Sequence, residues 1–183
     1  KLAPSEQAMR YMGAWLTTMR YAGKKIVTLT VRRQDTQPDR NCDIRAWTDL
    51  RQWLGQRGYA VLWIDDSNDA LTRGHGFHEL DPDLRLALYE RAAMNLIGAN
   101  GPSVLLWFSS APFMQFNVGV QQKWIDHMAE HMHLKEGEQL PWARPDQRLV
   151  WKPDTFEVMR EEFQKWESEQ SAAVKKVEVA AGP

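Results

Sequence analysis

The residues with the clearest capacity for chemistry lie in a glycine-containing turn at 98–102. The turn joins a short apolar strand predicted at 94–97 to a helix predicted at 103–110. Gly98 and Gly101 permit backbone angles closed to other residues. A helix N-terminus after such a turn has unpaired N–H donors and a positive dipole end, which predicts an anion site. An ordinary strand-to-helix turn is the alternative interpretation. The predicted phosphate-facing residues are Asn100, Gly101, Pro102 and Ser103.

Charged side chains stand at the ends of the other predicted strands. Arg32 and Arg33 end the first strand. Asp65 and Asp66 end the second, and Lys152 ends the last. Ligands of parallel sheets bind beyond the carboxyl ends of the strands, so we expect these residues to lie near the glycine-containing turn. Guanidinium groups bind phosphate oxygens bidentately, and an acidic side chain suits ribose hydroxyls, so the set predicts a nucleoside-diphosphate site.

The histidines fall into two groups with different interpretations. His75 and His78 lie in a polar loop after the second predicted strand, where an imidazole with an ordinary pKa can act as an acid or a base. His127 and His131 lie one turn apart on a predicted helix, with His133 close by. Two histidines at this spacing can bind zinc, but a site needs a third ligand and supporting contacts. We therefore predict no metal site and interpret this pair as a solvated helix face.

The elements that must position these residues alternate between apolar strands and amphipathic helices. The predicted strands are 25–32, 59–65, 94–97, 113–117 and 147–151, and the predicted helices are 4–22, 43–58, 82–93, 103–110, 121–132 and 155–170. This alternation is typical of an α/β fold, a Rossmann-like three-layer sandwich with a mostly parallel sheet of about five strands and helices on both faces. We predict one domain over 1–170 and a flexible tail over 171–183.

Composition narrows the classes of protein to which the chain can belong. A formal net charge of −1 argues against a general nucleic-acid binder, which normally carries a basic surplus. Cys42 is the only cysteine, which excludes an intrachain disulfide and favours a reducing, cytoplasmic location. The sequence has neither an apolar run long enough to span a membrane nor a signal-peptide pattern. Because the chain opens at Lys1 without a methionine, we expect a fragment of a longer protein or a processed one.

Three segments of the chain resemble a known family: VTLTVRRQDTQPDRN, GYAVLWIDD and LYERAAMNLIGANGPSVLLWFSSAPFMQF. Their order is similar to the C-terminal half of GT-B-type glycosyltransferases and of their uncharacterised bacterial relatives. The resemblance covers 26–116, and the closing helix at 151–166 is in keeping with it. By position it implies that Arg33 contacts the donor phosphate and that Asp65 or Asp66 lies near the nucleoside. The resemblance places Gly101, Pro102 and Ser103 in the phosphate-facing turn.

The resemblance implies the donor-binding domain of a glycosyltransferase, with a nucleoside-diphosphate sugar as ligand. No metal or other cofactor is expected. Arg33 and the helix N-terminus would stabilise the departing nucleoside diphosphate. An N-terminal domain, absent from this chain, would supply the acceptor site, and the methionine-rich face of helix 4–22 is expected to pack on it or to promote self-association. A Rossmann-like binding or scaffolding module without chemistry is the alternative.

Overall fold

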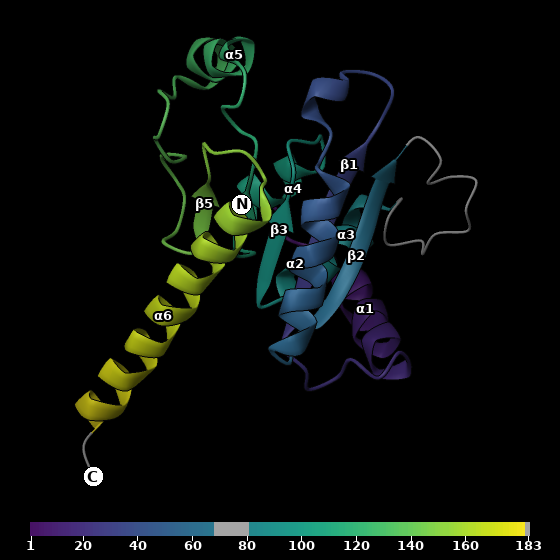
Figure 1. Ribbon diagram of the computed structural model, residues 1–183. Helices are drawn as coiled ribbons and strands as arrows, with labels where there is room; N and C mark the ends of the chain where they lie inside the picture. The colour runs from purple at the N-terminus through teal and green to yellow at the C-terminus, as the bar shows by residue number, and fades with distance from the viewer. Residues whose placement is uncertain (68–80, 182–183) are drawn as a thin grey trace.

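The chain folds around one five-stranded parallel sheet. The computed structural model describes residues 1–67 and 81–181, with side chains as far as residue 173. Neighbouring strands all pair in parallel, in the order β2-β1-β3-β4-β5 (Figure 1). The strands are β1 (Ile26–Arg33), β2 (Ala60–Ser67), β3 (Met94–Ile97), β4 (Phe113–Gln115) and β5 (Gln147–Leu149). The predicted α/β fold with a parallel sheet of about five strands is confirmed.

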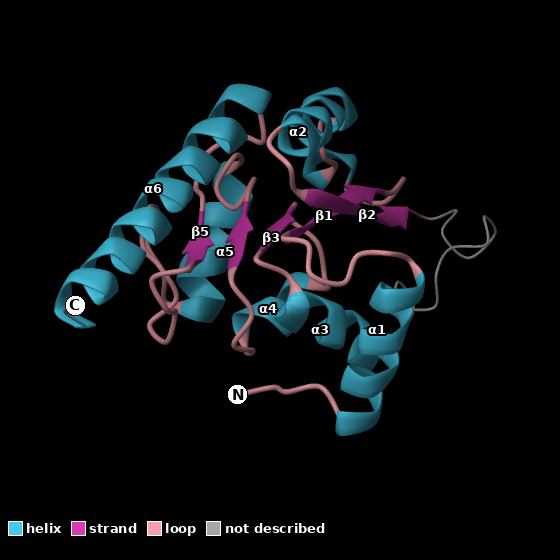
Figure 2. Ribbon diagram, turned by 90° about the horizontal axis from the view of Figure 1, so that it is seen from below, coloured by secondary structure: helices cyan, strands magenta, loops and turns pink. Residues whose placement is uncertain are grey.

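Helices cover both faces of this sheet, which makes three layers (Figure 2). α2 and α6 lie on one face, and α1, α3 and α4 lie on the other. Each interface has its own cluster of buried apolar side chains. The helices are α1 (Glu6–Thr18), α2 (Ile44–Gln56), α3 (Pro82–Arg91), α4 (Ser103–Trp107), α5 (Gln122–Met132) and α6 (Phe156–Ala181), with a short 3₁₀-helix, η1 (Pro38–Arg40). α5 belongs to neither layer and lies beyond the carboxyl edge of the sheet (Figure 1).

The strand order contains one reversal of direction. β1 pairs with β2 on one side and with β3 on the other, and the chain then continues outward through β4 and β5. The order 2-1-3-4-5 is that of flavodoxin-type doubly wound sheets, whereas the two-half dinucleotide-binding fold has the order 3-2-1-4-5-6. In both arrangements ligands bind outside the carboxyl ends of the strands near the reversal, so this edge is where a site is expected.

Burial along the strands follows their place in the sheet. Residues 26–31 of β1 and all of β3 are buried, as their continuous apolar sequences predict for central parallel strands. β2 differs from the prediction, because Val61 and Trp63 are only half-buried while Leu62 and Ile64 are buried. The two pairs face opposite sides of the sheet: Leu62 and Ile64 belong to one buried cluster, whereas Val61 and Trp63 pack only partly against the other. Among the described strands β2 is the edge strand, so the helices cover it less completely.

The first residues of the helices agree with the predicted positions better than the last residues do. Ser5, Asp43 and Asp81 cap α1, α2 and α3 by accepting N–H bonds with their side chains. α1 stops at Thr18, before its predicted end at residue 22. α6 instead continues to Ala181, through most of the segment predicted as a tail. Despite the length of α6, no helix among the described residues combines the length and apolar character that a membrane span requires.

Candidate functional site

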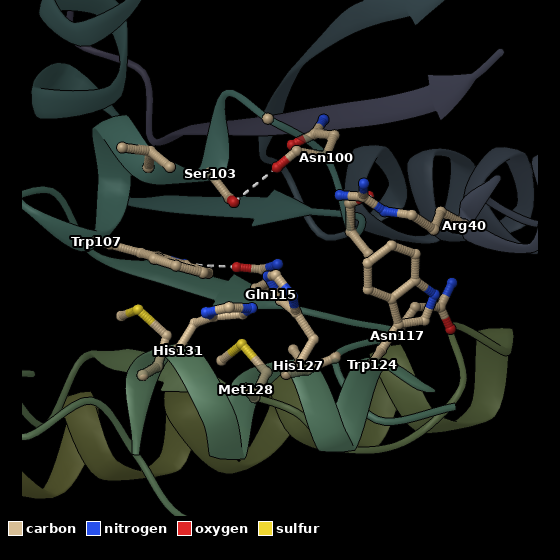
Figure 3. A pocket seen from close by; sticks show the side chains of 15 residues that line it. Arg40, Asn100, Ser103, Trp107, Gln115, Asn117, Trp124, His127, Met128 and His131 are labelled. Carbon is tan, nitrogen blue, oxygen red and sulfur yellow. Dashed lines mark hydrogen bonds between the residues drawn. The ribbon is translucent and has the colours of Figure 1, made fainter. Parts of the chain in front are cut away.

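A pocket of about 270 Å³ lies at the carboxyl edge of the sheet, beyond the ends of β3 and β4 (Figure 3). Asn100, which follows β3, and Gln115, at the end of β4, line it together with Trp107 of α4. α5 supplies the facing wall, and Arg40 of η1 lies at one end. The pocket occupies the edge at which parallel sheets bind ligands, so it is the candidate site.

Arg40 gives this pocket its positive charge. Its Nε donates to the Ala99 carbonyl at 3.0 Å and its Nη1 donates to Gln37 Oε1 at 2.9 Å, both neutral acceptors. Its guanidinium carbon lies 4.7 Å from the ring centroid of Trp124. Burial, and next the charge of nearby Arg32, lowers the pKa of Arg40. Because no carboxylate within the described ranges forms an ion pair with this guanidinium, an anion bound there would be stabilised.

Arg32 carries a second positive charge in this region, but its guanidinium is engaged in hydrogen bonds with the loop that follows β1. It is 4% exposed, and its guanidinium donates to four oxygens of the loop that follows β1. These acceptors are Gln34 Oε1, the Thr36 carbonyl, the Gln37 carbonyl and Asn41 Oδ1, at 2.6–3.2 Å. Arg32 therefore shapes the loop that presents Arg40. The structure gives Arg32 a supporting role in this loop, and its predicted contact with phosphate stays a prediction.

Gln115 is a buried residue whose side-chain amide has a fixed orientation. Its side chain is 5% exposed, and its Oε1 accepts the indole N–H of Trp107 at 2.6 Å. An indole N–H can only donate, so the amide oxygen must face Trp107 and the amide nitrogen must face away. Gln115 Nε2 has no hydrogen-bond partner in the described part of the chain. This nitrogen is therefore available to donate to an acceptor atom of a ligand in the pocket.

Asn100 connects the pocket to a buried ion pair. Asp66 Oδ1 accepts from Arg85 Nη1 at 2.8 Å, and Asp66 Oδ2 accepts from Asn100 Nδ2 at 2.8 Å. Burial raises the pKa of Asp66 despite the opposing effect of Arg85. Asn100 Oδ1 is buried and finds no hydrogen-bond partner among residues 1–67 and 81–181. Asp66, predicted to lie near a nucleoside, thus acts on the pocket only through Asn100.

α5 lines its side of the pocket with aromatic and sulfur-containing side chains. His127 and His131 point from α5 toward Gln115 and Trp107 (Figure 3). Their ring centroids are 4.4 Å apart. Both residues are exposed, as predicted, but the predicted solvated face is also a pocket wall. Within the described ranges, no three His, Cys, Asp or Glu side chains are grouped so as to hold a metal ion.

Three of the N–H donors that were predicted to be free at the start of α4 are bonded. The Ser103, Val104 and Leu105 amides donate to the carbonyls three residues earlier, at 3.4, 3.2 and 3.1 Å. The Ser103 hydroxyl also donates to the Asn100 carbonyl at 2.7 Å. These bonds arise because α4 is a single short helix whose first turn closes on the preceding turn. The prediction of several unpaired donors is wrong for these three amides, so an anion here would depend mainly on side chains such as Arg40.

The remaining predicted site residues lie away from this pocket. Arg33 Nη2 is 3.9 Å from Asp65 Oδ2, and this partly exposed pair joins the ends of β1 and β2. Lys152 Nζ is 3.2 Å from Glu162 Oε1 of α6. His75 and His78 lie outside the described residues. The structure therefore brings Asn100, Gly101 and Ser103 together in the pocket, with Pro102 in the adjoining turn, and leaves Arg33, Asp65 and Lys152 elsewhere on the carboxyl edge.

Gly98 is needed for space and not for its backbone angle. The described glycines with positive φ are Gly23, Gly58 and Gly137, so the predicted special angles at Gly98 and Gly101 are absent. A Cβ added at Gly98 would lie 2.3 Å from Cys42 Sγ, whereas one added at Gly101 would meet nothing within 4 Å. Gly98 thus lets the end of β3 pass close to the loop that carries Arg40.

Replacing Gly98 with Ala should lower the free energy of unfolding by about 1–3 kcal/mol, because the new methyl group overlaps buried Cys42 Sγ. Urea unfolding followed by circular dichroism measures the loss. Gly101→Ala is the matched control and should stay within about 0.5 kcal/mol of the parent. Adding Cys42→Ala to Gly98→Ala should recover part of the loss. Equal stability of the two glycine variants would contradict the steric explanation.

The residues that define the pocket chemically, Arg40, Gln115 and Trp124, were not among the predicted site residues. One signal pointed to Arg40, since the polar connection 33–43 is long for a link between a strand and a helix. Gln115 lies in an apolar strand. A single polar side chain there is expected to be buried and to form specific hydrogen bonds, which indicates a role in a site. The pocket combines an arginine without an ion-pair partner among the described residues, an amide donor and aromatic walls, and these features suit an anionic ligand that carries a ring.

Comparison of the chain with protein-family models, with curated proteins and with solved structures found no match. Neither a shared fold nor a strand order determines an activity by itself. The charge and the hydrogen-bonding groups of the pocket determine which ligands it can hold.

Proposed function

We propose that this chain is the donor-binding domain of a glycosyltransferase-like protein and binds a nucleoside-diphosphate sugar at the carboxyl edge of its sheet. The observation that carries this proposal is Arg40, a half-buried guanidinium without a carboxylate partner in the described ranges, at one end of a pocket with aromatic walls. The order of the sequence motifs, which resembles the C-terminal half of GT-B enzymes, supports the same ligand class.

The size of the pocket indicates which part of such a ligand would lie inside it and which part would extend beyond it. Sites for whole drug-sized ligands are about 300–1,000 Å³, so 270 Å³ suits one ring and its substituents. A ring placed between Trp107 and the α5 wall would meet Gln115 Nε2 with one of its acceptor atoms. The diphosphate would then extend toward Arg40, whose fork of N–H donors matches phosphate oxygens.

In this proposal the catalytic contribution of the chain is electrostatic. During transfer, the bond between the anomeric carbon and the diphosphate oxygen breaks, a bond to the acceptor oxygen forms, and the acceptor proton passes to a base. Arg40 would stabilise the negative charge that develops on the leaving diphosphate. The acceptor and its positioning would come from the N-terminal domain implied by the resemblance, so the isolated chain should bind nucleotide but transfer little sugar.

A binding module without chemistry is the second candidate, and one observation favours it. No carboxylate lines the described pocket, and its titratable side chains are Arg40, His127 and His131. A base for the acceptor proton would therefore have to be a histidine of α5 or a group from another domain. Because the isolated chain is expected to transfer little sugar in either case, the test needs the acceptor domain: firm nucleotide binding without sugar transfer in its presence would favour this second function.

Nucleotide binding should raise the melting temperature of the chain by mass action, and Arg40→Ala should weaken that binding about ten- to hundredfold. The loss is expected because charge-assisted bonds to phosphate disappear. Isothermal titration calorimetry with UDP, GDP, ADP and CDP, and thermal unfolding at millimolar nucleotide, measure the effect. No response of the parent chain to any of the four nucleotides would remove the donor-site proposal.

Two control variants locate the phosphate. Arg51→Ala removes an arginine that lies 6.0 Å from the ring centroid of Trp63, a similar arginine–tryptophan contact away from the pocket, and should leave nucleotide affinity unchanged. Arg33→Ala tests the position predicted from the sequence. If Arg33→Ala abolishes binding while Arg40→Ala does not, the phosphate lies over the ends of β1 and β2 and the pocket assignment is wrong.

A further inference from the structure

α5 is the pocket wall with the fewest attachments to the rest of the fold. It lies apart from both helix layers (Figure 1), and Met128 is its single buried residue. It nevertheless contributes Trp124, His127 and His131 to the pocket. A wall of this kind needs a specific contact to hold it in place. We infer that Asp39 is a positioning residue that fastens α5 over the pocket, an inference that does not depend on which ligand binds there.

Asp39 makes two bonds to consecutive residues at the start of α5. Its Oδ2 lies 2.7 Å from Lys123 Nζ and accepts the Trp124 indole N–H at 3.0 Å. The bonds from Lys123 and Trp124 lower the pKa of Asp39, so the carboxylate is charged at neutral pH. We call these two bonds the Asp39 latch. The latch joins η1 to α5 across 85 residues of sequence.

The other end of α5 is attached in a different way. Met128 and the nearby Leu134 are buried in the apolar cluster that includes side chains of α1, α3 and α4. The helix ends at Met132, and the next residue, His133, adopts a left-handed conformation with φ of 53°. Apolar burial therefore anchors the last turns of α5, while polar contacts hold the first turn. Opening of the latch would let the first turn move and leave the last turns in place.

The latch also determines whether Arg40 is covered. Asp39 and Arg40 are neighbours in η1, and Trp124, which donates to Asp39, lies over the Arg40 guanidinium at 4.7 Å. Release of Trp124 from Asp39 would expose this cation and displace the wall that carries His127. One short turn thus presents the anion-binding group and holds the side chain that covers it. The latch couples access to Arg40 to the position of α5.

Amide hydrogen exchange of the unliganded chain tests the latch. Asp39→Ala should speed exchange of the α5 amides about tenfold, because one ion pair and one indole bond are lost, and should leave the amides of α2 unchanged. Asp39→Asn keeps an acceptor for the Trp124 indole and should give a smaller increase. Asp126→Ala is the matched control: it removes a carboxylate of α5 whose one hydrogen-bond partner among the described residues is Gln122 of the same helix.

Variants on the α5 side separate positioning from general destabilisation. Lys123→Met combined with Trp124→Phe removes both donors without altering η1 and should reproduce the Asp39→Ala exchange pattern. Asp39→Lys combined with Lys123→Asp should recover part of the slow exchange by restoring the ion pair. Unchanged exchange in α5, or equal acceleration throughout α2 and α5, would overturn the inference. Because no nucleotide is present, this result is independent of the nucleotide-binding experiment.

Discussion

Replacing Arg85 with Met should lower the free energy of unfolding by about 3–5 kcal/mol at pH 7. Arg85 and Asp66 form an ion pair at 2.8 Å with side-chain exposures of 4% and 8%. Without the arginine, a buried carboxylate would retain the Asn100 amide but lose the positive charge that offsets its desolvation. Urea unfolding of the parent and the variant at pH 7 measures the difference.

A double variant distinguishes a buried charge from lost packing. Asp66→Asn combined with Arg85→Met removes both charges and should recover more than half of the lost stability, since a neutral pair carries no desolvation cost of an ion. If the double variant is as unstable as Arg85→Met alone, the loss comes from the packing of the arginine side chain. A change below about 1 kcal/mol in Arg85→Met would contradict the assigned role of the pair.

The stability deficit of Arg85→Met should shrink as the pH falls. Burial already raises the folded-state pKa of Asp66 above its ordinary value of 3.8, and removal of Arg85 raises it further. A carboxyl group with a raised folded-state pKa binds its proton more tightly in the folded chain, so its penalty is complete above that pKa and disappears as pH falls toward 3.8. Unfolding measured between pH 7 and pH 4 should show the two proteins converging; parallel curves would contradict this explanation.

Trp47→Ala should cost about 3–5 kcal/mol, the range for removal of a buried large aromatic side chain. Trp47 is fully buried in α2, packs edge-on against Phe116 with ring centroids 6.1 Å apart, and donates its indole N–H to Asp154 Oδ2 at 2.6 Å. Asp154 in turn donates its own amide N–H to Asn117 Oδ1, beside the pocket. The variant should therefore also loosen the pocket. Urea unfolding gives the magnitude.

Two substitutions test the separate contributions of Trp47. Trp47→Phe keeps most of the packing but removes the donor to Asp154, and should cost about 1–3 kcal/mol. Trp142→Ala removes a tryptophan that is 43% exposed and stacked on Phe108, and should cost less than about 1 kcal/mol. A loss in Trp47→Ala no larger than that in Trp142→Ala would show that Trp47 does not support the core as described.

The sequence by itself determined the fold class, the helix starts and the edge of the sheet that holds the pocket. The continuous apolar strands β1 and β3, and the capping residues Ser5, Asp43 and Asp81, depend on neighbours a few residues away, so local patterns were sufficient to predict them. The rule that ligands bind at the carboxyl ends of parallel strands then located the site to one edge.

Only the tertiary structure decided which residues at that edge meet. Periodicity defines the apolar face of an element but not its neighbours, so the sequence left open the place of β2 at the edge and the path of the loop that carries Arg40. A charged side chain at a strand end can turn inward or outward according to contacts made far along the chain. The Arg32 side chain points toward the loop that follows its own strand and bonds to Asn41, and Asp66 forms an ion pair with Arg85. α5 became a pocket wall through contact with Asp39, 85 residues earlier, a contact that local sequence does not encode.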